Sequence, residues 1–342
     1  MPRPAAPHDP VDLGPLARPV RRSLNGDHPG ETGTALPALI DHHVHLEMVH
    51  PERLPGGGIA GVVDLGANPA VVARLAAADG LPAIRFAGQF LTAPGGYPGG
   101  RWWLRDGSLR EVPAGPPPAA TGSLPGPAEL AVDEQAVFGA SVVKVVLNAD
   151  AGPVFDDATL AAIVRAAHER GLGVAVHAEG DGTARRAIDA GADVLVHTPW
   201  TEALPDELLA SAAAAAGQAW ISTLDIHARD GVPGDLDRAV SNLRRFREAG
   251  GRVLYGTDLG NGDLPDGVNG RELDALVAAG LDAHALIEAL TDPWPAADRE
   301  AWGLDGVVTF VAGPPPATLA EVPAWLAGAR LLPAEELEEL DP

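Results

Sequence analysis

Short apolar runs alternate along most of the chain with longer segments that have helical periodicity. Eight such runs, rich in Val, Ile, Leu and Ala, lie at residues 38–45, 59–66, 82–89, 141–147, 173–177, 193–197, 219–224 and 252–257. Near-continuous apolar runs of this length are typical of strands that are buried on both faces of a parallel sheet. The pattern therefore predicts eight parallel strands.

The segments between the runs predict helices. They lie at residues 69–78, 127–139, 156–170, 183–190, 204–216, 235–249 and 270–279. Several are followed by a glycine that can end a helix, and Asp156 is a candidate N-cap. Repeated strand–helix units predict an α/β fold, and eight units over about 250 residues match a (β/α)8 barrel in size.

We expect the chain to have three parts. The barrel spans residues 39–304, and a Gly- and Pro-rich loop at 91–126 leaves the C-terminal end of its third strand. Because a loop this long in a compact domain is usually functional, we expect it to cover an active site. Residues 1–38 predict an extended or partly disordered arm that contributes to a small flanking β subdomain, and residues 305–342 predict the rest of that subdomain and a tail. Short strands in this last part are predicted at 306–312 and 330–332.

Composition limits the classes of function. Hydrophobic residues make up 46% of the 342, but no apolar run approaches the ~20 residues of a membrane span. The N-terminal segment lacks the apolar stretch and cleavage site of a secretory signal, so we expect a cytoplasmic protein. A formal net charge of −23 would repel nucleic acid. There is no cysteine, so a transition metal would have to be held by His, carboxylate or a less usual ligand.

One lysine stands out among the basic residues. The chain has 24 basic residues, and all of them except Lys144 are arginine. Lys144 lies within an apolar run, where a surface charge is not expected. Lysine can lose its proton and arginine cannot. This position therefore indicates a role that needs an amine, or else a lysine retained at a strand end by chance.

Groups that can bind metal follow or end several of the predicted strands. His43 and His45 lie two residues apart at the end of the first strand, so their side chains point to the same face. The ends of four further strands carry Lys144, His177, His197 and Asp258. Barrel active sites gather at the C-terminal ends of the strands. The set therefore predicts a metal site there.

These segments resemble the amidohydrolase superfamily, in particular its imidazolonepropionase-related and prolidase-like members. The resemblance covers roughly residues 36–312, and its motifs lie at 36–46, 91–98, 140–147, 166–177, 187–197 and 255–260. It implies a metal-dependent hydrolase with two zinc ions per chain, or manganese or another divalent cation. By this resemblance, one metal is bound by His43, His45 and Asp258, and the other by His177 and His197. Lys144 would carry a CO2-derived carbamate that bridges the two metals.

The resemblance also implies a mechanism. Metal-activated hydroxide would attack a carbonyl, and Asp258 would act as general base and then as general acid. The chain departs from the family after the third strand, where the usual PGGH-type segment reads PGGY and places Tyr97 at the histidine position. Candidate substrate-binding residues are Tyr97, Trp102, Trp103 and His227.

We expect hydrolysis of a C–N bond in an amide, cyclic imide or lactam of a small soluble molecule. The alternatives are a lactonase, esterase or phosphotriesterase on the same centre, a deaminase suggested by Glu179 two residues after His177, and a catalytically silent binding barrel. The intact ligand set argues against the silent barrel. A homo-oligomer is left open.

Overall fold

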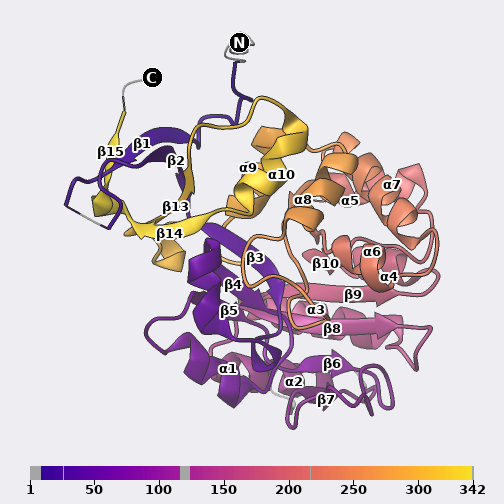
Figure 1. Cartoon of the computed structure of the whole chain (residues 1–342). Helices are drawn as coiled ribbons and strands as arrows, with labels where there is room; N and C mark the ends of the chain where they lie inside the picture. Colours follow the sequence, from indigo (N-terminus) through magenta and orange to yellow (C-terminus); the bar gives the residue numbers. More distant parts are fainter. Residues whose placement is uncertain (1–8, 26, 116–123, 216, 341–342) are drawn as a thin grey trace.

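The strands of the computed structural model form two parallel sheets and one antiparallel sheet (Figure 1). The structure describes residues 9–340 except 26, 116–123 and 216. The larger parallel sheet has seven strands in the order β12 (Arg252–Leu254), β11 (Ala219–Ile221), β10 (Val194–Val196), β9 (Gly173–Glu179), β8 (Val142–Asn148), β6 (Phe90–Thr92) and β7 (Leu109–Glu111). The smaller one has the order β3 (Leu39–Val44), β4 (Ile59–Asp64) and β5 (Ala83–Phe86). The α/β fold and the parallel sheet are confirmed.

Backbone hydrogen bonds connect the two parallel sheets at both edge strands of the smaller sheet, β3 and β5. The N–H of His42 in β3 donates to the carbonyl of Tyr255 just after β12, at 3.0 Å, and the N–H of His45 donates to the carbonyl of Leu259 at 2.7 Å. On the other side, the N–H of Ser141 before β8 donates to the carbonyl of Phe86 in β5, at 2.9 Å. These bonds place β3 next to the segment that follows β12, and β5 next to the start of β8.

Helices follow most of these strands, and a further short helix, α10, packs on α8. They are α1 (Pro69–Ala76), α2 (Pro127–Val137), α3 (Asp157–Glu169), α4 (Thr183–Asp189), α5 (Asp206–Ala214), α6 (Asp225–Asp230), α7 (Asp235–Glu248), α8 (Gly270–Ala278), α9 (Ala283–Thr291) and α10 (Val322–Leu326). The Asp156 carboxylate accepts the N–H of Thr159 at 2.7 Å, so the predicted N-cap is confirmed. The rings of Trp220 in β11 and Phe246 in α7 are fully buried and stacked, with centroids 4.0 Å apart.

The third sheet is built from both ends of the chain. Its antiparallel order is β14 (Arg330–Pro333), β13 (Val307–Ala312), β2 (Thr32–Pro37), β1 (Arg18–Arg22) and β15 (Leu337–Glu339), and Figure 1 shows it to one side of the parallel sheets. Its small core contains Val20, Ala35 and Phe310. Within residues 1–38, β1 and β2 are thus paired strands of this small sheet rather than an arm without secondary structure. Both pair with strands from the far end of the chain, which local sequence pattern does not reveal; residues 1–8 lie outside the described part.

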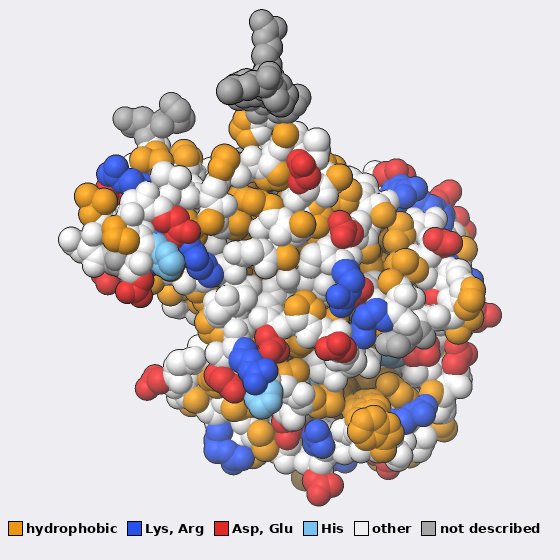
Figure 2. Space-filling model, in the orientation of Figure 1, with side chains coloured by type: hydrophobic (Ala, Val, Ile, Leu, Met, Phe, Trp, Pro, Cys, Tyr) orange, Lys and Arg blue, Asp and Glu red, His pale blue; other side chains and the backbone are white. Residues whose placement is uncertain are grey.

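Other predicted bounds also change. The third predicted strand ends at Phe86 rather than residue 89, because the chain turns before it enters β6. The segment 91–126 holds the end of β6 and all of β7, and its residues 116–123 lie outside the described part, as does residue 216 at the end of a predicted helix. None of the described helices is long and apolar enough to cross a membrane. On the face drawn in Figure 2, acidic and basic side chains are interspersed.

Candidate active site

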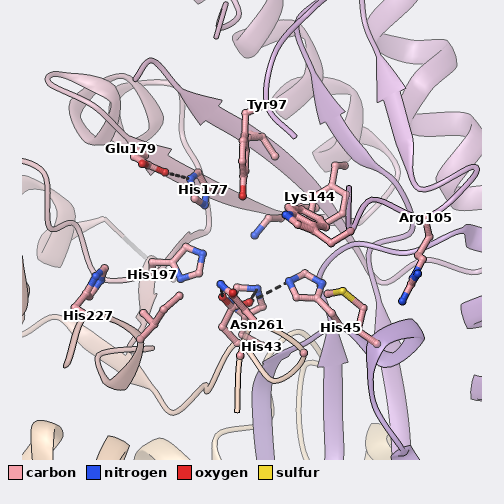
Figure 3. Close-up of a pocket in the computed structure, with 18 of the residues that line it drawn as sticks. His43, His45, Tyr97, Arg105, Lys144, His177, Glu179, His197, His227 and Asn261 are labelled. Carbon is pink, nitrogen blue, oxygen red and sulfur yellow. Dashed lines mark hydrogen bonds and ion pairs between the residues drawn. The ribbon is translucent and has the colours of Figure 1, made fainter. Parts of the chain in front are cut away.

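All six predicted metal ligands line one cavity of about 520 Å³ at the C-terminal ends of the parallel strands (Figure 3). His43, Lys144 and His177 lie within strands β3, β8 and β9, whereas His45, His197 and Asp258 lie just beyond strands β3, β10 and β12. Each of the six residues is buried, with no more than 8% of its surface exposed. The parallel arrangement brings groups together that are up to 215 positions apart, since 258 − 43 = 215.

Asp258 lies at the middle of this group. Its Oδ1 atom is 3.2 Å from Nε2 of His43 and 3.1 Å from Nε2 of His45, and its Oδ2 accepts the amide N–H of Asn261 at 2.8 Å. Burial acts to raise the pKa of Asp258, but the imidazoles of His43, His45 and His197 hold that pKa well below its usual value. The carboxylate is therefore ionised and available as a ligand or proton acceptor.

The histidine rings form a continuous cluster. The ring centroids are 5.1 Å apart for His43 and His45, 4.8 Å for His43 and His197, and 5.0 Å for His177 and His197. Burial lowers the pKa of His43 and of His197 well below the ordinary histidine value, so the rings are neutral and keep a lone pair. Ligand atoms of His43, His197 and Asp258 lie within 4.8 Å of one another.

The donor set fits a cation. Nδ1 of His43 is buried without a partner among the described residues, and its Nε2 has only the ion-pair contact with Asp258 and no hydrogen bond, which is costly unless another group satisfies these nitrogens. Neutral imidazoles and an ionised carboxylate are the ligands that zinc and similar cations take in cysteine-free sites. Mutual proximity, neutral rings and unsatisfied nitrogens together indicate a metal site.

Lys144 places its amine in the same cavity. The residue is 2% exposed, and burial lowers its pKa to about 7 although the nearby carboxylates of Asp258 and Asp64 act to raise it. Among the described residues, its amine has no hydrogen bond or ion pair. An amine with this pKa is substantially uncharged at neutral pH and can act as a nucleophile.

Neighbouring side chains fix the orientation of the predicted ligands. Nε2 of His177 lies 3.0 Å from the carboxylate of Glu179, which also accepts the amide N–H of Asn148 at 2.5 Å. The carboxylate of Asp41, which shares a strand with His43, accepts the hydroxyl of Thr257 at 2.5 Å and so holds the residue next to Asp258. Such contacts orient metal ligands in proteins.

The walls of the cavity are largely aromatic. The predicted substrate-binding residues Tyr97, Trp102, Trp103 and His227 all line it. Trp102 lies at the outer side and is 92% exposed, whereas the rings of Trp103 and Tyr97 contact each other with centroids 6.1 Å apart. Burial lowers the pKa of His227 to about 4, so this ring is neutral.

Sequence reasoning missed several lining residues. These are Met48, Phe90, Arg105, Val146, Trp200, Ile226, Gly260, Asn261 and Gly262, and Glu179 had been noted only as a deaminase feature. Trp200 had a usable signal, because it follows His197 by three residues at a strand end. Arg105 had none beyond its place in the 91–126 segment.

Comparison with known proteins identifies the family. Residues 52–270 match the model of the amidohydrolase family. No protein among those with curated functions matches the sequence.

Solved structures show the same fold at low sequence identity. A Xaa-Pro dipeptidase with bound methionine is 19% identical, with a TM-score of 0.64, over 90% of this chain and 87% of that one. Ochratoxinase from A. niger is 20% identical, with a TM-score of 0.63, over 86% and 80%. Molinate hydrolase is 18% identical, with a TM-score of 0.63, over 90% and 83%. Since the family match also spans more than half of the 342 residues, this chain belongs to the amidohydrolase family and is a hydrolytic enzyme.

Proposed function

We propose that this protein hydrolyses a C–N bond of an amide, cyclic imide or lactam in a small molecule, with two divalent cations held in the described cavity. The observation that carries the proposal is the cluster of His43, His197 and Asp258 beside the buried amine of Lys144. We assign His43, His45 and Asp258 to one cation and His177 and His197 to the other. Zinc is the first candidate and manganese the second. When bound, the cations would lower the pKa of water towards neutrality and polarise a carbonyl group.

Lys144 would complete the ligand set as a carbamate. In that reaction the uncharged amine nitrogen adds to the carbon of CO2, and the proton released from nitrogen passes to solvent. The product offers two oxygen ligands and one negative charge where an ammonium group would repel cations. Its burial at 2% exposure and its lowered pKa support this assignment.

Asp258 would move the proton during hydrolysis. It would accept a proton from the attacking water and deliver it to the nitrogen of the leaving group, so that one carboxylate serves as base and then as acid. Its central place among the histidines and its contact with Asn261 support this role.

The aromatic walls indicate the kind of substrate. Phe90, Tyr97, Trp103 and Trp200 would contact an apolar or planar part of a small molecule, because aromatic surfaces gain most from such contacts. The similar solved structures include a Xaa-Pro dipeptidase, whose name describes cleavage of a C–N bond. No observation favours ester, lactone or phosphotriester cleavage over C–N cleavage, and Glu179 is engaged by His177 and Asn148 rather than placed as a deaminase acid.

We further propose that the two parallel sheets act as one closed (β/α)8 barrel over residues 39–304. The hydrogen bonds of His42 with Tyr255 and of Ser141 with Phe86 support this closure. The remaining parts, residues 1–38 and 305–342, would form the small β subdomain.

The test is an assay of the protein loaded with zinc and bicarbonate. The probes are 4-nitroacetanilide and 4-nitrophenyl acetate, which share an acyl and an aryl group and differ in the bond cleaved, together with N-acyl amino acids, Xaa-Pro dipeptides and cyclic imides. We expect the wild type to cleave C–N bonds. In Asp258→Asn the rate of this cleavage should fall by about 10²- to 10⁴-fold. Asp263→Asn, an exposed change in the same loop, is the matched control and should retain activity.

Two results would contradict the proposal. One is that the metal-loaded wild type cleaves C–N bonds no faster than Asp258→Asn does. The other is cleavage of the ester alone across the whole panel, which would support the esterase alternative.

A further inference from the structure

Tyr97 has a hydroxyl group that faces the candidate metal centre without an assigned partner. Figure 3 shows the phenol oxygen directed into the cavity, towards the space between Lys144 and His197. The structure gives this hydroxyl no hydrogen bond to another described residue. It is thus a donor that a molecule in the cavity can use.

The tyrosine ring is held in place on several sides. It is stacked on the imidazole of His177, with centroids 5.8 Å apart and an angle of 26° between the planes. The guanidinium carbon of Arg101 lies 5.2 Å from its centroid, and the ring of Trp103 packs against it in an edge-on arrangement, with the two centroids 6.1 Å apart. Because these contacts restrict the ring, the hydroxyl has little freedom to turn away. A donor fixed before the reaction begins is what electrostatic stabilisation of a transition state requires.

Three other polar side chains of the cavity are already engaged. His177 contacts Glu179, His197 contacts the hydroxyl of Thr223 at 2.8 Å, and Asn261 donates to Asp258. His227 is a further neutral group with an unsatisfied nitrogen, but in Figure 3 it lies beyond His197 as seen from Lys144. Tyr97 is therefore an uncommitted neutral donor whose hydroxyl points into the cavity near Lys144.

We propose that Tyr97 is a catalytic residue that donates a hydrogen bond to the oxygen of the scissile carbonyl as negative charge develops there. The inference rests on the proposed hydrolysis. Hydroxide forms a bond to the carbonyl carbon, and the π electron pair moves to the oxygen, where the Tyr97 O–H stabilises it without giving up its proton. When the C–N bond breaks, that electron pair returns and the nitrogen leaves with the proton carried by Asp258.

The first test is Tyr97→Phe, which keeps the ring stacked on His177 and removes only the hydroxyl. We expect kcat for the amide and the ester probes to fall by about 10²- to 10³-fold, with little change in KM or in bound zinc. Tyr255→Phe is the matched control: it removes the chain's only other tyrosine hydroxyl, which accepts the N–H of Asn269 outside the cavity. It should lower stability and leave kcat nearly unchanged.

A binding measurement separates this inference from the proposed function. Methylphosphonate mimics the tetrahedral, negatively charged intermediate, whereas acetate is a planar product. By calorimetry on zinc-loaded protein, we expect Tyr97→Phe to weaken methylphosphonate binding at least tenfold and to leave acetate binding unchanged.

The outcomes are distinguishable. Suppose that the wild type cleaves the probes and that Tyr97→Phe has the same kcat, with or without a higher KM. The role proposed for Tyr97 is then refuted, while the hydrolase proposal stands. If the wild type cleaves none of them, the proposed function fails. Equal methylphosphonate affinity in wild type and Tyr97→Phe would overturn the inference in that case as well.

Discussion

Nδ1 of His197 lies 2.8 Å from the hydroxyl oxygen of Thr223, and both residues have a positive φ, of 68° and 44°. Positive φ is a genuine outlier for a β-branched residue and costs on the order of 1–3 kcal/mol. The surrounding fold therefore holds Thr223 in a conformation that places its hydroxyl against the imidazole. If Nδ1 carries the proton and donates it to this hydroxyl, Nε2 keeps the lone pair that a cation needs.

Thr223→Val should weaken metal binding, because valine keeps the β-branched shape but cannot accept the hydrogen bond from His197. We expect zinc affinity to fall by about 10- to 100-fold, as is typical when a partner of a ligating histidine is removed. Competition with a chromogenic chelator measures it. Thr223→Ser, which retains the hydroxyl, should behave like the wild type, and an unchanged affinity in the valine variant would refute the role.

Lys144→Ala should lose one of the two metals and most activity, because it removes the carbamate that we propose as their common ligand. Small carboxylic acids such as acetate or propionate should restore part of the activity, since the space left by the side chain can take a carboxylate. Metal analysis and an activity titration with the acid provide the readouts. Full activity without added acid would rule out the carbamate.

Glu272 should make the stability of the fold depend on pH. Burial raises its pKa from 4.5 to about 7, although hydrogen bonds from Ser222 and from the backbone of Leu224 and Asp225 act to lower it. Between these two values the folded state binds more protons than the unfolded state, so the free energy of unfolding falls as pH rises from about 4.5 through 7. Below that window the contribution is fully present.

Glu272→Gln should remove this dependence, because glutamine does not ionise and can still accept the N–H of Asp225. Urea unfolding in the presence of chelator at pH 5 and pH 8 would give the comparison. Between pH 5 and pH 8, we expect the free energy of unfolding of the wild type to fall by up to roughly 3 kcal/mol more than that of the variant. Equal losses in both proteins would show that Glu272 does not titrate in this window.

Phe246→Ala should destabilise the fold without touching the cavity. Phe246 and Trp220 are fully buried and their ring planes are only 6° apart, so truncation leaves a large void between α7 and β11. We expect a loss of about 3–5 kcal/mol in the free energy of unfolding and a smaller loss for Phe246→Leu. Denaturant unfolding measures both, and similar losses in the two variants would argue against a packing effect.

The candidate site could be predicted from sequence because its residues occupy the most predictable places in the fold. His43, Lys144 and His177 each lie within or at the end of a buried apolar run, and parallel strands bring such ends to one side. The single lysine could be noticed by counting alone. Whether these residues meet in space depends on the strand topology. The alternation of strands and helices along the chain predicted a parallel topology, which brings them to one side of the fold.

Elements that depend on distant partners could not be predicted. β1 and β15 pair across more than 300 positions, and the three residues of β7 give no periodic signal within a Gly- and Pro-rich segment. Thr223 was missed for a different reason, since a positive φ at a threonine contradicts its local preference. Such conflicts between local preference and structure are expected at functional sites.

Native mass spectrometry of the protein loaded with zinc in bicarbonate buffer tests the central claim most directly. We predict that each chain carries two zinc ions and the mass of one CO2, that acid treatment removes all three, and that Lys144→Ala loses the CO2 and one zinc. A wild-type chain that binds no zinc, or two zinc ions with Lys144 unmodified, would contradict the proposed centre.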